Sequence, residues 1–156
     1  MYVHISYSAT PTHAHTRIAV NTIYELADGS YTAHGMSTRA YLAEAQQLRR
    51  HLTAHHTIEE QRIFPVLATR MPKFANADGA AHIASHHAIH EGLDALGKLL
   101  AKYAADPTTY TPAEMRACLD GWRGVLFKHL DEEVEDLSAA NMKKYWKLHE
   151  VDRIPF

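Results

Sequence analysis

The chain has 156 residues, of which 46% are hydrophobic and 22% charged, values typical of one soluble globular domain. A net charge of −2 gives no basic surface, so nucleic acid is not an expected partner. The start, MYVHISYSATPTH, lacks the pattern of a signal peptide, and no run approaches the roughly 20 apolar residues of a membrane helix. We therefore expect a cytoplasmic protein with no membrane partner, and the single cysteine, Cys118, suits a reducing compartment.

Apolar residues recur at steps of three or four along most of the chain, and convincing β alternation is absent, which predicts an all-α fold. Pro11 and Pro112 fit first helical positions, whereas Asp28-Gly29 and Asp106-Pro107 fit helix ends. The expected helices cover about 11–27, 37–68, 78–105, 112–137 and, shorter, 138–150. Short connections between four long amphipathic helices predict an up-down four-helix bundle with a short C-terminal helix.

Three pairs of metal-capable residues interrupt the apolar stripes of these helices, each pair with a spacing of four. The pairs are His55 with Glu59, His86 with His90, and His129 with Glu133. Residues four apart in a helix share a face, so both members of a pair can reach one point. A bound metal would remove the cost of burying them unpartnered. Mixed imidazole and carboxylate ligands favour iron, manganese or zinc over calcium.

Other metal and nucleophilic sites do not fit the spacing. His90-Glu91 is not followed by the second histidine of a His-Glu-x-x-His zinc motif, and no glutamate has a histidine three residues later, as ferritin-like sites require. Cys118 has no second cysteine for a thiolate site and is expected to be a buried core residue.

The segments HHTIEEQRIFP, HHAIHEGLDAL and HLDEEVEDL follow one another on the second, third and fourth expected helices. In this order they resemble the hemerythrin-like family, also called the HHE cation-binding domain. The resemblance covers nearly the whole chain and implies a single domain over 1–156, with a four-helix core at about 11–137 and an extension at 138–156. The tail, LSAANMKKYWKLHEVDRIPF, resembles those of fungal members. Respiratory hemerythrins have Asp five residues after the fourth-helix histidine, where this chain has Val134 and carries Glu133 one position earlier.

The first helix offers two histidines for the family's first-helix ligand. His13 and His15 lie about 200° apart on a helix, so only one of them can face the core. His15 is followed one turn later by Ile18 and Ala19, whereas His13 is followed by Thr16 and Arg17. We therefore expect His15 to be the ligand, with His13 as the alternative.

The resemblance implies a site for two irons, with carboxylate bridges, an oxo or hydroxo bridge and one open position. Its ligands would be His15, His55, Glu59, His86, His90, His129 and Glu133. The expected function is binding of O₂ or a related diatomic or peroxide, as a carrier or sensor. The first alternative is a di-iron oxidase, oxygenase or peroxidase-like enzyme acting on an organic substrate, and the second is iron storage or handling. Zinc or manganese could replace iron, and the oligomeric state is not readable.

The remaining histidines and carboxylates carry weaker expectations. His56 and His87 each lie about 100° from a chosen ligand, so they are expected around the site or at the surface. His51 and His82 lie one turn from a ligand and could line the site or a path to it. Glu60 is expected to be solvated.

Overall fold

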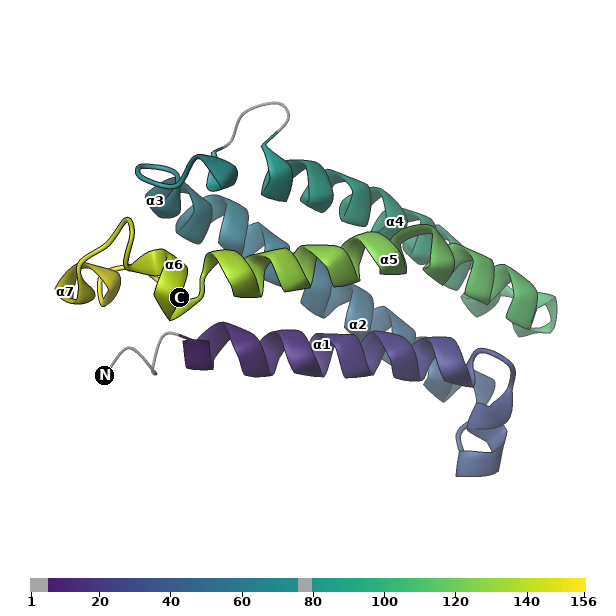
Figure 1. Ribbon diagram of the computed structural model, residues 1–156. Helices are drawn as coiled ribbons and strands as arrows, with labels where there is room; N and C mark the ends of the chain where they lie inside the picture. Colours follow the sequence, from purple (N-terminus) through teal and green to yellow (C-terminus); the bar gives the residue numbers. More distant parts are fainter. Residues whose placement is uncertain (1–5, 76–79) are drawn as a thin grey trace.

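The computed structural model describes residues 6–75 and 80–156, with the side chains of residues 6–12 left out of that description. Its long helices are α1 (Ser6–Leu26), α2 (Thr38–Ile58), α4 (Ala81–Ala105) and α5 (Pro112–Asp136). Each of them runs antiparallel to the next (Figure 1), and each packs against two neighbours, so that α2 lies between α1 and α4 and α5 closes the ring against α1. This arrangement confirms the expected all-α bundle. Among the described residues no helix is long and apolar enough to cross a bilayer.

Side-chain caps mark the starts of two of the four long helices. The Ser37 hydroxyl accepts from the Ala40 N–H at the start of α2, and Thr111 accepts from the Glu114 N–H at the start of α5, where Pro112 takes the first position. The start expected for the first helix is wrong, because α1 begins at Ser6 and Pro11 lies inside it. A proline there removes only one backbone hydrogen bond near the helix end. The residues expected to open the third helix, from 78, lie partly outside the described residues.

The second expected helix contains an interruption next to the site. After α2 comes a π-helical turn, Glu59–Ile63, and then the short helix α3 (Phe64–Leu67). The Phe64 N–H donates to the Glu59 carbonyl five residues back, and Pro65 follows with no N–H to continue the usual ladder. Such wide turns change the direction of side chains and are frequent at functional sites. Here the turn buries Glu59 and leaves Glu60 half-buried.

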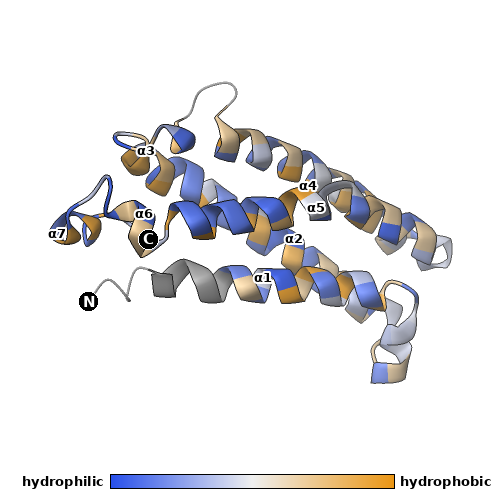
Figure 2. Cartoon of the chain, viewed as in Figure 1, coloured by the Kyte–Doolittle hydropathy of each residue, from blue (hydrophilic) through white to orange (hydrophobic). Residues whose placement is uncertain are grey.

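Two apolar clusters fill the bundle, and polar residues separate them. The larger cluster contains Leu52 of α2, Ile89 of α4 and Leu126 of α5. The smaller cluster contains Phe64 of α3, Ile83 of α4 and Leu137, which follows α5. Along α2 and the π turn, along α4 and along α5, the histidines and glutamates lie between the members of the two clusters. Figure 2 shows the resulting mixture of hydrophobic and hydrophilic stretches along the long helices.

The single C-terminal helix expected over 138–150 is wrong. Two one-turn helices replace it, α6 (Ala139–Met142) and α7 (Leu148–Val151). The chain between them turns so that Trp146, Val151 and Ile154 enter the smaller apolar cluster. Arg70 holds this tail by two hydrogen bonds of 2.9 Å to Glu150 and by stacking over the Trp146 ring at 4.3 Å. Tail packing therefore overrides local helix propensity.

Candidate metal centre

Seven side chains from five elements meet between the two apolar clusters. They are His13 of α1, His55 and His56 of α2, Glu59 of the π turn, His86 of α4, and His129 and Glu133 of α5. We call this set the histidine–carboxylate cluster. All of its members except His55 are buried. The cluster therefore joins all four sides of the bundle in its interior.

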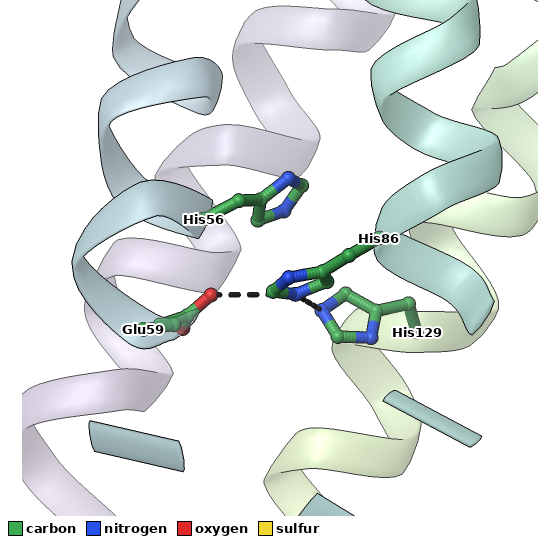
Figure 3. Close-up of side chains that lie close together, drawn as sticks. All are labelled: His56, Glu59, His86 and His129. Atoms are coloured by element: carbon green, nitrogen blue, oxygen red, sulfur yellow. Dashed lines mark hydrogen bonds and ion pairs between the residues drawn. The ribbon is translucent and has the colours of Figure 1, made fainter. Parts of the chain in front are cut away.

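One half of the cluster lies between α2, α4 and α5 (Figure 3). The Nε2 atoms of His86 and His129 are 3.0 Å apart, and Oε2 of Glu59 lies 3.5 Å from Nε2 of His86. The ring of His56 stacks on that of His86 with centroids 4.1 Å apart. Three potential ligand atoms thus converge where α2, α4 and α5 meet.

The other half lies between α1, α2 and α5. Nε2 of His55 is 3.1 Å from Oε1 of Glu59, and Nε2 of His13 is 3.2 Å from Oε2 of Glu133. The His13 and His55 rings approach edge to face at 5.8 Å. This half uses the same two glutamates that face His86 and His129.

Both glutamates are therefore shared between the halves. Glu59 presents one oxygen to His55 and the other to His86. Glu133 presents Oε2 to His13 and, at 3.6 Å, to Nε2 of His129. A carboxylate placed between two sets of imidazoles is the arrangement that a bridging ligand between two metal ions requires.

The unpartnered atoms of the cluster test whether a metal fits. Both carboxylate oxygens of Glu133 and Oε2 of Glu59 are buried without a hydrogen-bond partner among the described residues, as are Nδ1 of His13 and Nε2 of His55. Native proteins partner the great majority of such atoms. Several orphans in one place, all of them metal-ligand types, fit a bound cation far better than a metal-free core.

The ionisation of the cluster also suits cation binding. Burial is the main cause that lowers the pKa of His86 and of His129 to about 3, so both imidazoles are neutral and offer a lone pair at neutral pH. Burial, aided by the nearby Glu133, raises the pKa of Glu59 well above its usual range. For Glu133 burial acts in the same direction, but contact with His13 and the nearby histidines outweighs it and lowers the pKa. Without a metal, the ionised form is therefore favoured for Glu133 and disfavoured for Glu59, whereas bound cations would favour the ionised form of both.

Residues around the cluster hold its imidazoles in position. Nδ1 of His86 lies 2.7 Å from Oε1 of Glu60, and an ionised carboxylate can only accept, so Nδ1 carries the proton and Nε2 turns its lone pair toward the centre. Glu60, expected to be solvated and not ligating, is one-third exposed and lies outside the cluster, but its carboxylate is paired with His86. On the opposite side, buried His82 offers a further possible ligand atom within 4.8 Å of those of His129 and Glu133. Its Nε2 contacts Oδ2 of Asp136 at 3.0 Å, and Lys73 donates to Oδ1 of the same carboxylate at 2.8 Å.

The structure brings five of the expected ligands together and leaves two outside. The five are His55, Glu59, His86, His129 and Glu133. The prediction that His15 faces the core is wrong, because His15 is exposed, as is Ile18 at 62%, and His13 lies in the cluster instead. His90 does not join the cluster either: it is half-exposed, and its Nε2 lies 3.5 Å from Glu60. Because the Glu60 carboxylate faces α4, its contact with His90 keeps that imidazole at the edge of the cluster.

Sequence reasoning ranked His13 second to His15, and it placed His56 around the site or at the surface. For His13 a signal was present, because Val20 and Ala27 follow at steps of seven and are fully buried. The position of His56 could not be predicted from a single buried face, because α2 packs against two helices and so has two buried faces. His55 points to α1 and His56 to α4, and both therefore reach the centre.

A helical bundle with a buried histidine and carboxylate cluster defines a metal-binding helical domain. The family profile described as "Hemerythrin HHE cation binding domain" matches residues 9–140. The chain therefore belongs to the hemerythrin HHE cation-binding family.

A curated relative is the "Dimeric xanthone biosynthesis cluster protein R11" of Cryptosporiopsis sp. (strain 8999), which is 36% identical over 96 residues. The aligned region is 60% of this chain but only 34% of that protein, so the chain spans about a third of its length. This fungal relative is consistent with a fungal source. No solved structure matches the chain significantly.

Proposed function

We propose that the cluster is a non-haem di-iron centre that binds O₂ or a related small diatomic. His13 and His55 would hold one iron. His86 and His129 would hold the other, and His56 lies beside them. Glu59 and Glu133 would bridge the two ions. The observation that carries this proposal is the sharing of both glutamates between two sets of imidazoles.

The protein's own residues would prepare this centre for a redox ligand. When bound, two ferrous ions supply the two electrons that O₂ takes up. Glu60 fixes the orientation of His86, and the stacked His56 ring fills the space beside it. Leu52 and Leu130, both almost fully buried, keep bulk water from the larger-cluster side. An apolar shell of this kind controls the access of solvent to a metal centre and thereby its redox potential.

The test is stopped-flow mixing of the anaerobic di-ferrous protein with O₂. A new optical band that disappears on flushing with argon supports reversible binding. The absence of any optical change on mixing would contradict the proposal.

A second candidate is oxidation of an organic substrate at the same centre. Two observations favour it: a cavity of about 310 Å³ has His55 in its wall, and the curated relative is named for a biosynthesis cluster. In the same stopped-flow experiment this enzyme would be oxidised irreversibly, and an added organic substrate would yield product in proportion to the iron oxidised.

A further inference from the structure

A cavity of about 310 Å³ lies between α1 and α2, directly outside the candidate centre. Leu48 and Leu52, both buried, form its apolar floor together with Ala19. His15, Thr16 and His51 provide its polar wall. His15, which the sequence suggested as a ligand, is thus part of this wall and not of the metal cluster.

His55 connects the cavity to the centre. Its side chain is 25% exposed, whereas those of the other cluster members are at most 7% exposed. Its Nε2 atom is buried against Glu59, so the exposed part of the ring is the part away from the centre. Since His55 also lines the cavity, one imidazole ring separates a molecule in the cavity from the candidate metal ligands.

The lining determines which ligand the cavity can accept. Among the side chains that the structure describes, no Asp, Glu, Lys or Arg lines it, so no described group there compensates a full charge on the ligand. Imidazoles and a hydroxyl can both donate and accept hydrogen bonds, which suits a hydroxyl or carbonyl group. An apolar cavity of about 150 Å³ holds a benzene ring, so one of this size holds roughly two rings.

We propose that this cavity is a binding site for a neutral aromatic molecule of one or two rings that carries a hydroxyl group. The ring system lies on Leu48 and Leu52, the hydroxyl group meets His51, and one edge contacts His55. This inference rests on the proposed function only for its link to the metals, because occupancy of the cavity can be measured without them.

The experiment uses 2-naphthol as the probe and its fluorescence as the readout, first with metal-free protein. Thr16→Trp fills the cavity and should weaken 2-naphthol binding at least tenfold. The matched control is Ala68→Trp, which fills a cavity of similar volume between α3 and α4. It should leave 2-naphthol binding unchanged. 2-Naphthoate, the anion of equal size, should bind more weakly than 2-naphthol to the unmodified protein.

His51→Leu is a second variant, chosen because His51 is exposed and its loss leaves the core intact. It should weaken 2-naphthol binding severalfold. Absence of 2-naphthol binding by the unmodified protein, equal losses in Thr16→Trp and Ala68→Trp, or unchanged affinity in His51→Leu would overturn the cavity site.

The iron-loaded protein separates the two proposals. Contact with His55 should make 2-naphthol shift the optical spectrum of the loaded centre, and Thr16→Trp should abolish this shift while retaining iron. A chain that binds 2-naphthol but takes up no iron would refute the di-iron centre and leave the cavity site standing. A loaded chain with bound 2-naphthol and an unchanged spectrum would overturn the contact with His55.

Discussion

Arg17 explains which histidine of α1 faces the centre. A buried arginine on the His13 face is unfavourable, but Arg17 extends to the rim, where it donates to Asp131 Oδ1 at 2.6 Å and to the Phe127 carbonyl at 3.1 Å. Its guanidinium also lies 4.7 Å from the centre of the Phe127 ring. Long cationic side chains can cover apolar surface in this way while the charge stays in water. The His13 face can therefore be the core face.

Replacing the two histidines of α1 should have unequal effects on metal binding. His13→Ala should lose at least half of the bound iron, because His13 is one of two imidazoles beside the Glu133 and Glu59 bridge. His15→Ala should retain it, since His15 is exposed. Iron quantitation after reconstitution checks both variants. Retention of full iron by His13→Ala would show that α1 supplies no ligand.

Glu60 should act on the metals through His86. Glu60→Ala removes the acceptor 2.7 Å from Nδ1 of His86, and the ring then loses its fixed tautomer and orientation. Loss of such a partner typically costs 10–100-fold in metal affinity. A competitive titration with a chelator measures the change. Glu132→Ala is the control, because Glu132 is paired with exposed Lys128. Equal affinities of the two variants would contradict the assigned role.

At the scale of helices, the contact of α4 with α5 depends on Gly92. A Cβ atom at this position would lie 2.3 Å from Cβ of Trp122, which is itself buried. Gly121, on the facing helix α5, has nothing within 4 Å of the same ideal Cβ. The first glycine permits close packing, and the second has no such role.

Alanine at these two glycines should therefore change stability in opposite directions. Gly92→Ala should destabilise the fold by roughly 1–3 kcal/mol, the usual cost of overpacking a core. Gly121→Ala should be neutral or stabilise by up to about 1 kcal/mol through helix propensity. Urea denaturation of the two variants measures both. A Gly92→Ala protein as stable as Gly121→Ala would show that the helices can separate without cost.

The π turn sets a limit to reading helices from sequence. Periodicity predicts one continuous second helix, and it placed His55 and Glu59 on one face as observed. It cannot show that the backbone ladder shifts by one residue after Ile58, because this depends on Pro65 and on packing of Phe64 into the smaller cluster. The direction of Glu60 depends on that shift. The tail was unpredictable for a related reason, since its shape depends on Arg70 and on the apolar cluster that it completes.

At the scale of the whole molecule, the long helices followed from hydrophobic spacing alone, whereas the division of the core into two apolar clusters is visible only in the structure. Five of the six members of the pairs with a spacing of four lie in the centre, and only His90 stays at its rim, so the spacing also located the centre. What spacing could not show is the number of neighbours that a helix has. α2 packs against both α1 and α4, and for this reason two consecutive histidines point to the centre.

Acid should destabilise the metal-free protein. His86 and His129 have a pKa of about 3 when folded, against about 6.5 for an unfolded histidine, so between these values the unfolded state binds more protons. Stability present above pH 6.5 is thus lost as the pH falls toward 3, by about 1 kcal/mol for each imidazole between pH 7 and 5.5. The raised pKa of Glu59 acts oppositely but involves one group. A urea midpoint that is not lower at pH 5.5 than at pH 7 would contradict this balance.

The number of metal ions per chain tests the central claim most directly. The two glutamates each face two sets of imidazoles, so a single ion would leave one set and half of the carboxylate contacts unused. After anaerobic reconstitution with ferrous iron and removal of excess, metal analysis of the unmodified protein should give about two irons per chain, as one bridge-linked pair requires. One iron per chain or less would contradict the bridged centre.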